Sequence, residues 1–138
     1  MKTLVIYYSY TGTVRNLAEK IATETGATLY EIKDKTRPGT LKAYSAGCFA
    51  ALRMGRWPIQ PVNMSFEGYG SIILMAPVWA GHPAPAFNNV YGLLPRGQEV
   101  EVRMVSASGS SSAREKIQRE LISKGCKMTG YRDIKSKV

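Results

Sequence analysis

The sequence has little cysteine, a single histidine and no long apolar run. Its two cysteines, Cys48 and Cys126, have neither paired spacing nor neighbouring histidines, so the pattern indicates no zinc site and no disulfide framework. We expect two free thiols in a reducing, cytoplasmic compartment, with one disulfide between them as the alternative. No apolar run approaches the roughly 20 residues of a membrane-spanning helix. The sequence therefore predicts a soluble globular protein without membrane contact.

Acidic residues are also scarce, with 10 Asp and Glu against 19 Lys and Arg, which gives a net charge of +9. The excess lies in two blocks: residues 33–56 hold six bases and one acid, and residues 112–138 hold eight bases and three acids. We expect both blocks to lie away from the loop after the first predicted strand. Such a field attracts acidic proteins, nucleic acid or membranes. Because no aromatic residues interleave the charges, we favour a solvated surface and do not expect nucleic-acid binding.

Apolar periodicity predicts one α/β domain over residues 1–138. Five apolar or alternating runs are typical of strands, at residues 2–8, 28–32, 71–77, 99–106 and 126–132. Helical spacing predicts helices from Thr13 to a stop at Gly26, from Thr40 to about Met54, around residues 87–94, and from a Ser112–Glu115 capping box to Gly125. This alternation with short connections is typical of a doubly wound parallel sheet.

Three predicted strand ends are rich in small and hydroxyl-bearing residues. They are residues 9–14, 77–83 and 106–111, and none of them contains Asp or Glu. In an open parallel sheet, ligands bind at the carboxyl ends of the strands, near the point where the strand order reverses. Hydroxyls and N–H groups at a helix N-terminus suit a phosphate. One such loop is more typical of a turn, but three together predict a site for an anionic, planar ligand.

The loops and their flanks resemble the flavodoxin family. The resemblance is carried by YYSYTGTVRNLA, APVWAGHPAPAF and SASGSSS, and it is closest to small single-domain members that share a Pro-Val-Trp-x-Gly segment. It implies a five-stranded sheet of order 2-1-3-4-5 with FMN bound at the switch point. The family's phosphate loop reads Ser/Thr-x-Thr-Gly-x-Thr, and Val14 stands where the last Thr is usual. Losing that hydroxyl should weaken binding by about 0.5–1.5 kcal/mol rather than abolish it.

The resemblance gives each loop a role in holding FMN. The first would hold the phosphate through Ser9, Tyr10, Thr11, Gly12, Thr13 and Val14. The second would lie along the ribityl chain and the ring edge through Pro77, Val78, Trp79, Ala80 and Gly81. The third would bond the pyrimidine end of the ring through the backbone of Ser106, Ala107, Ser108 and Gly109. Trp79 has the character to stack on a flavin, and its alternative role is to cap the core.

His82, the only histidine, would lie near this site. Its charge changes near neutral pH, so a role in proton transfer is one hypothesis. A histidine that precedes a proline in a loop is more often simply exposed, and we favour that interpretation.

The end of the chain departs from the family pattern. The fold usually closes with a helix after the fifth strand, but DIKSKV is too short and too polar for one, and we interpret residues 134–138 as a basic tail. In strand 99–106, Glu99, Glu101 and Arg103 point to the face that such a helix would cover. We expect this polar face to meet water, a partner or a second copy in a dimer, unless the chain is part of a longer protein.

We interpret the sequence as a flavodoxin-like electron carrier whose chemistry is supplied by FMN, with no catalytic residue or metal site of its own. Its partners would be redox proteins, acidic ones in view of the charge of +9. One alternative is a small NAD(P)H-dependent reductase of quinones or flavins, although no nicotinamide domain is present. The other is a non-redox binding module with a degenerate FMN site, which Val14 supports.

Overall fold

Five parallel strands form the sheet in the computed structural model, which describes residues 2–136. They are β1 (Lys2–Tyr8), β2 (Thr28–Ile32), β3 (Tyr69–Trp79), β5 (Glu99–Ser106) and β6 (Lys127–Lys135). The order is β2-β1-β3-β5-β6, and the two-residue β4 (His82–Pro83) pairs antiparallel with the end of β3. Counted over the parallel strands alone, this is the predicted order 2-1-3-4-5. The predicted fold class is therefore confirmed.

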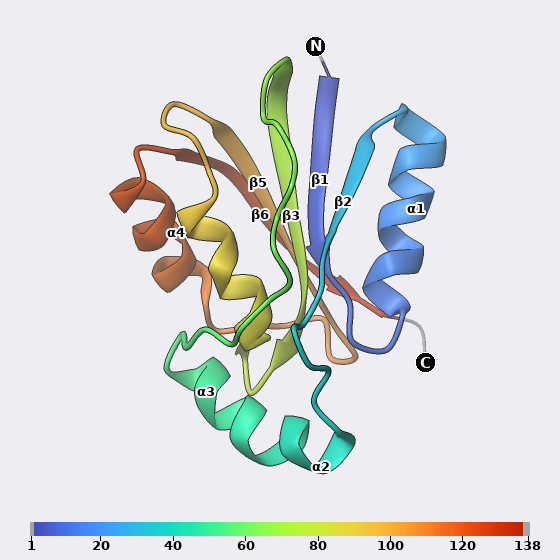
Figure 1. The fold of residues 1–138 in the computed structure, drawn as a ribbon, viewed down its shortest axis with the longest axis vertical. Coiled ribbons are helices and arrows are strands. Elements are labelled where there is room, and N and C mark those ends of the chain that lie inside the picture. Colours follow the sequence, from blue (N-terminus) through green and yellow to red (C-terminus); the bar gives the residue numbers. More distant parts are fainter. Residues whose placement is uncertain (1, 137–138) are drawn as a thin grey trace.

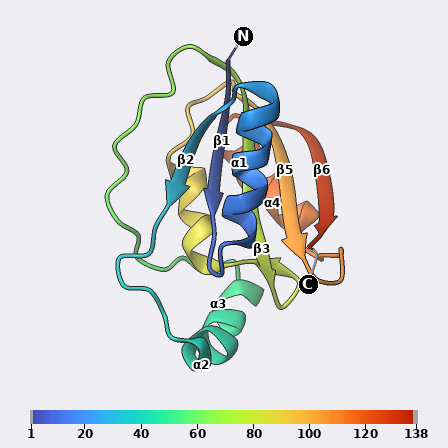
Figure 2. The same cartoon turned by 90° about the vertical axis from the view of Figure 1, so that its right-hand side faces the viewer.

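The two faces of the sheet are covered unequally (Figures 1 and 2). α1 (Thr13–Thr25) packs on one face over a small cluster that includes Val5 and Met75. The 3₁₀ helix η2 (Pro85–Gly92) and α4 (Arg114–Ser123) cover the other face, which holds the larger core. No helix follows β6 in the described part of the chain. None of the helices within residues 2–136 is long and apolar enough to cross a membrane.

The polar face predicted for residues 99–106 is present beside α1. Glu101 accepts from Arg103 on the same strand, and its Oε2 lies 3.9 Å from Nε of Arg132 on β6. On the opposite face, Val100 and Val102 are fully buried. Glu101 therefore pairs with two arginines within this polar face, which suits contact with water.

Residues 33–68 make a long excursion between β2 and β3. A continuous helical run consists of α2 (Thr40–Lys42), the π turn η1 (Ala43–Gly47) and α3 (Cys48–Leu52), and it lies at the carboxyl ends of the strands (Figure 1). The prediction placed this helix correctly. Its boundaries were wrong, because Gly39 is the N-cap instead of Thr40 and the run ends at Leu52.

Three other predicted features differ from the structure. The Ser112–Glu115 capping box does not form: α4 begins at Arg114 without a side-chain cap, and the N–H of Ser112 instead donates to Gly81 O at 2.7 Å. The helix around residues 87–94 is a 3₁₀ helix. The last strand continues to Lys135, so Ile134 and Lys135 of the predicted basic tail pair with β5, and residues 137–138 of that tail lie outside the described residues. Both cysteines are free thiols, as expected.

Candidate functional site

The loop after β1 turns tightly around one serine side chain. Ser9 Oγ accepts the N–H groups of Gly12 at 3.1 Å and Arg15 at 3.2 Å. Gly12 caps α1 with a φ of 102°, a conformation that favours glycine. Helix geometry leaves the N–H groups of Thr13 and Val14 without an acceptor in α1. These two donors and the positive end of the helix dipole can therefore hold an anion.

The side chain of Val14 does not belong to this loop. It is 2% exposed and packs with Val5, Tyr7 and Ala18 between α1 and the sheet. Val14 therefore contributes packing with its side chain and a donor with its backbone. The expected cost of its missing hydroxyl stays a prediction.

Arg37 lies over the same loop. Its guanidinium carbon is 4.0 Å from the centroid of the Tyr10 ring, and its Nη2 donates to Tyr10 O at 3.0 Å. Tyr10 in turn donates its hydroxyl to Pro38 O at 2.8 Å. The expectation that the basic block 33–56 is distant from this loop is wrong. β1 and β2 are neighbours in a parallel sheet, so the segments that leave their carboxyl ends lie side by side.

Each acidic residue near this loop has a partner. Glu31 Oε2 accepts from Arg15 Nη2 at 2.5 Å. Asp34 Oδ2 accepts the hydroxyl of Tyr8 at 2.6 Å. Burial raises the pKa of Asp34, while the bond from Tyr8 and the charge of Arg37 oppose that rise. Burial and the Asp34 carboxylate raise the pKa of Tyr8 far above its ordinary value, so its hydroxyl stays a donor.

Two hollows open on this loop, one on each side of Arg37. The Ser9 hollow has a volume of about 320 Å³ and is lined by Tyr8, Ser9, Tyr10, Thr11, Gly12, Arg15, Glu31, Ile32, Lys33, Asp34, Arg37 and Gln60. The Trp79 hollow has a volume of about 470 Å³ and is lined by Tyr10, Thr11, Arg37, Thr40, Ala43, Tyr44, Cys48, Val78, Trp79 and Ala80. The hollows share Tyr10, Thr11 and Arg37, so they adjoin one another, and we refer to the two together as the groove. Each lies in the size range of small-molecule sites, about 300–1,000 Å³.

Trp79 stands at the centre of an aromatic cluster. Its ring meets those of Tyr10, Trp57 and Tyr8 edge to face, with centroids 5.4, 6.4 and 6.5 Å away. A Cβ at Gly47 would lie 2.7 Å from Trp79 Cζ3, so only glycine lets η1 approach this ring. Trp79 therefore caps the core and also lines the hollow. Its role in stacking on a flavin stays a prediction.

The third predicted loop approaches the site without entering the groove. Its following residue, Ser112, is bound to Gly81, which joins the loops after β5 and β3. Of the described residues that line the two hollows, none comes from the loop 106–111, and the predicted residues Thr13, Val14, Pro77 and Gly81 do not line them either. β3 continues to Trp79, two residues beyond the predicted strand end, so Val78 and Trp79 belong to the strand. The structure therefore brings together the first loop, the end of β3 and Ala80.

His82 is buried, so the expected exposure is wrong. Its exposed fraction is 5%, its Nδ1 lies 3.0 Å from Ala80 O, and its Nε2 lies 2.9 Å from Lys116 Nζ. This geometry fits a ring whose Nδ1 donates a hydrogen bond to Ala80 O and whose Nε2 accepts one from the Lys116 ammonium. His82 lines neither hollow, and it ties the end of β3 to α4.

Sequence reasoning missed one wall of the groove. Arg37, Thr40, Ala43, Tyr44 and Cys48 line the Trp79 hollow from the excursion after β2. The available signal was the basic block and the helix predicted from Thr40. Nothing in the residue pattern indicated that this helix lies beside the strand ends.

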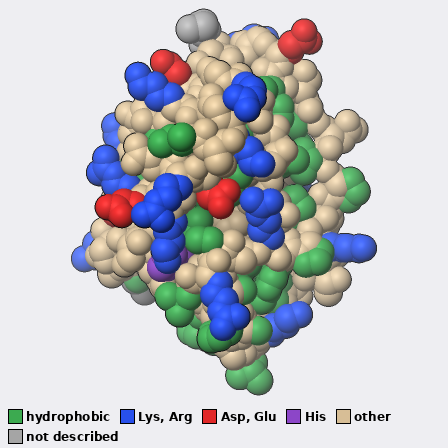
Figure 3. Space-filling view, turned by 90° about the vertical axis from the view of Figure 1, so that its left-hand side faces the viewer, with side chains coloured by type: hydrophobic (Ala, Val, Ile, Leu, Met, Phe, Trp, Pro, Cys, Tyr) green, Lys and Arg blue, Asp and Glu red, His purple; other side chains and the backbone are tan. Residues whose placement is uncertain are grey.

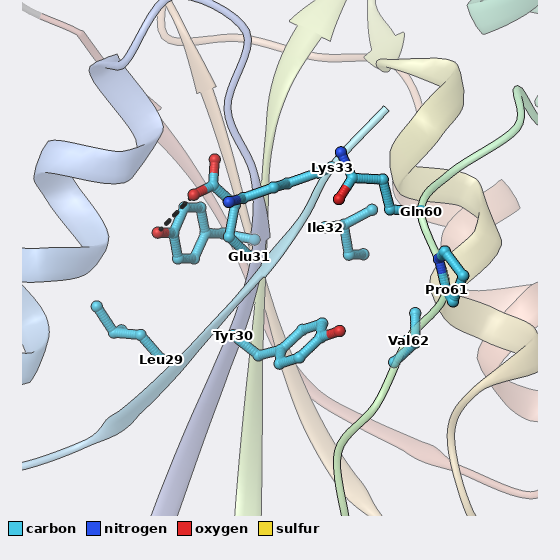
Figure 4. Close-up of a pocket in the computed structure, with 9 residues that line it drawn as sticks. Leu29, Tyr30, Glu31, Ile32, Lys33, Gln60, Pro61 and Val62 are labelled. Atoms are coloured by element: carbon cyan, nitrogen blue, oxygen red, sulfur yellow. Dashed lines mark hydrogen bonds between the residues drawn. The ribbon is translucent and has the colours of Figure 1, made fainter. Parts of the chain in front are cut away.

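A third hollow follows the edge of β2 (Figure 4). Its volume is about 420 Å³, and it lies between β2 and the returning segment at Gln60, Pro61 and Val62. Two charged residues line it: Glu31 accepts from Arg15 and, at 3.4 Å, from Tyr7, whereas Lys33 forms no salt bridge within the described residues. Unlike the Ser9 hollow, it is lined by no residue of the loop that leads into α1.

Comparison with family models and with curated proteins gave no match. Solved structures do match. A flavoprotein from Lactobacillus acidophilus NCFM, crystallised in complex with FMN, is 27% identical with a TM-score of 0.78, covering 96% of this chain and 93% of that one. A proposed flavoprotein from Bacteroides eggerthii DSM 20697 is 21% identical with a TM-score of 0.78, covering 95% and 86%. The flavodoxin of Streptococcus pneumoniae TIGR4 is 11% identical with a TM-score of 0.53, covering 100% and 87%. The chain therefore has the flavodoxin-like fold of these flavoproteins.

Proposed function

We propose that this protein binds FMN in the groove around Tyr10 and Arg37 and carries electrons on it. The observation that carries the proposal is the groove itself. It lies at the switch point of the sheet and joins an anion-binding helix start to a hollow lined by Trp79. The likeness to a flavoprotein crystallised with FMN, over 96% of this chain, supports the same ligand.

The donor groups of the first loop fit a phosphate ester. The N–H groups of Thr13 and Val14 point from the start of α1, and the hydroxyls of Thr11 and Thr13 lie 3.3 Å apart beside them. Arg37 is the one cation among the described residues that lines both hollows. Thr11 and Gly12 of this loop line the Ser9 hollow together with Arg37, so a phosphate bound there would find neutral donors and a guanidinium, and a guanidinium is a strong partner for this group.

The Trp79 hollow fits a planar, apolar ring. It is lined by Trp79, Tyr44 and Val78, and no carboxylate is among its described lining residues. When bound, FMN supplies reversible uptake and release of electrons, and the polypeptide supplies binding and electrostatic tuning. Arg37 and the positive end of α1 would favour the added negative charge of the reduced flavin. Two free thiols, Cys48 and Cys126, support a reducing compartment, which we propose is the cytoplasm.

One experiment separates this function from its alternatives. The purified chain is reconstituted with FMN, unbound flavin is removed, and NADPH is then added without oxygen. We expect a yellow protein that keeps its colour with NADPH and bleaches only with an added electron-donor protein or dithionite. Bleaching by NADPH alone would replace the carrier with a reductase, and failure to retain FMN would leave a binding module.

A further inference from the structure

The helical run of residues 40–52 buries small residues and exposes large apolar ones. Its buried residues are small, namely Ala43, Gly47 and Ala51. Its large apolar residues point to solvent: Leu41 is 83% exposed, Tyr44 76%, Phe49 56% and Leu52 49%. A surface helix normally turns its large apolar side chains toward the core. We call Leu41, Tyr44, Phe49 and Leu52 the outer ridge.

Packing against the aromatic cluster explains the small residues on the inward face of the run. It does not explain the large apolar residues of the outer ridge. Gly47 has no room for a Cβ beside Trp79, so the run must present small residues to the aromatic cluster. That requirement places no demand on the opposite side of the helix. Four of the five most exposed large apolar residues of the described chain nevertheless lie on this ridge. An apolar cluster of this kind marks an interaction site.

Positive charge borders the ridge. The Arg53 guanidinium carbon lies 4.1 Å from the centroid of the Phe49 ring, and Lys42 Nζ lies 5.3 Å from that of Trp57. Neither cation forms a salt bridge within the described residues. Figure 3 shows hydrophobic and basic side chains together at this end of the molecule. Residues 33–56 as a whole carry six bases and one acid.

The ridge is also continuous with the proposed cofactor groove. Tyr44 belongs to both, and Cys48, between Tyr44 and Phe49 in the sequence, lines the Trp79 hollow. The segments before and after the run are bound to each other, because Lys35 N donates to Pro58 O at 3.1 Å and Gln60 N donates to Lys33 O at 2.8 Å. A partner on the ridge would therefore reach the rim of the Trp79 hollow at Tyr44 without needing to unfold this segment.

We propose that the outer ridge is the docking surface for an acidic electron-transfer protein that exchanges electrons with the bound flavin. An apolar centre with a positive border complements an acidic surface and steers its approach. A second copy of this chain would bring two positive borders together. Electron-transfer complexes bury small interfaces, below about 1,200 Å², which a ridge of this length can supply. The exchange of electrons rests on the proposed function, whereas docking can be measured without it.

The test uses a plant-type [2Fe–2S] ferredoxin as an acidic probe and cytochrome c as a basic one. Binding of each oxidised protein to the full chain, with and without FMN, is followed by NMR titration at several salt concentrations. We expect the ferredoxin to bind, more weakly as salt rises, and cytochrome c not to bind. The double variant Lys42→Glu/Arg53→Glu should lose about tenfold in affinity. Leu41→Ser/Phe49→Ser should lose about tenfold also at high salt.

Two variants outside the ridge serve as controls. Lys20→Glu changes an exposed base on α1, and Ile122→Ser changes a 61% exposed apolar residue on α4. Both variants should bind ferredoxin as the parent does. Absence of ferredoxin binding, equal binding of cytochrome c, or ridge variants that bind like the parent would overturn the proposal. So would ridge-dependent binding to phosphatidylserine vesicles, or ridge-dependent self-association in sedimentation, which would assign the ridge to a membrane or to a second copy. A chain that takes up no FMN but binds ferredoxin through the ridge would refute the proposed function and keep the docking surface.

Discussion

The loops after β1 and β5 have the same internal design. In each, a serine near the end of the strand accepts the N–H of a glycine three residues later, Ser9 from Gly12 at 3.1 Å and Ser106 from Gly109 at 2.9 Å. Both glycines have positive φ, 102° and 74°. The hydroxyl of each serine also accepts a second N–H, from Arg15 in the first loop and Ser110 in the other.

Their surroundings differ. The first loop leads directly into α1, and Arg37 crosses above it with two hollows on either side. The second lies against β6: a Cβ at Gly109 would be 3.1 Å from Lys135 Cβ, and Ser136 N donates to Ser106 O at 2.8 Å. A hydroxyl-rich strand end therefore specifies a turn, and the chain that packs beside it decides whether there is room for a ligand.

The strongest test of this contrast is Trp79→Ala, because Trp79 lines the hollow beside the first loop. We expect FMN affinity to fall by about 2–3 kcal/mol, together with a loss of stability of about 3 kcal/mol from the cavity left among the rings. Flavin fluorescence titration and urea unfolding measure the two effects. The matched variant Trp57→Ala removes a ring of the same cluster that does not line this hollow, and should lose stability while keeping most of its FMN affinity. Equal loss of FMN in both variants would mean that Trp79 only supports the fold.

Arg37→Gln tests the charge above the first loop. A charge-assisted bond to the phosphate contributes about 1.5–3 kcal/mol, so FMN affinity should fall about tenfold or more. Affinity for riboflavin, which lacks the phosphate, should not change. Lys135→Gln removes a cation beside the other loop and should alter neither ligand. If riboflavin binding fell as far as FMN binding, Arg37 would act by holding Tyr10 rather than by meeting the phosphate.

A smaller effect separates the glycines of the two loops. Gly12→Ala places a side chain at a φ of 102°, where nothing lies within 4 Å, so it should cost about 1–2 kcal/mol of stability from the backbone alone. Gly109→Ala adds a close approach to Lys135 and should cost at least as much. Only Gly12→Ala should also reduce FMN affinity, because it disturbs the start of α1. Thermal unfolding and flavin titration of both variants measure this, and a loss of FMN from Gly109→Ala would place the second loop in the site.

The sequence predicted the strands more reliably than it predicted which residues pack around each element. The apolar run at residues 2–8 and the alternation at residues 99–106 predicted β1 and β5 with their exact bounds, because burial on two faces or one leaves a direct pattern. The helix at residues 40–52 was placed correctly, although its large apolar residues Leu41 and Tyr44 are exposed. Period alone does not tell which side of a helix meets the protein.

The candidate site was predicted where it depends on local chemistry and missed where it depends on the approach of distant segments. Thr11 and Trp79 were named from their own loops, and both line the Trp79 hollow. Arg37 was assigned to a remote basic block, because only the pairing of β1 with β2 brings it over the first loop. His82 was expected in solvent, and its burial depends on Lys116 from α4.

The smallest predicted effect concerns Asp34, which lines the Ser9 hollow beside the first loop. Burial raises its pKa in the folded protein above the ordinary value of 3.8. Its stabilising contribution is therefore complete below the unfolded pKa and is lost as pH rises through the folded pKa. Asp34→Asn can still accept from Tyr8 but does not titrate. Relative to the parent, its free energy of unfolding should increase between pH 3 and pH 7, by less than about 1 kcal/mol because the carboxyl is half-exposed. Urea unfolding of both proteins across this range measures the difference. If the difference in free energy of unfolding stayed constant or shrank as pH rises, the effects of Tyr8 and Arg37 on the pKa of Asp34 would outweigh that of burial. Asp34 would then be a fully charged acid in the groove that also holds the phosphate.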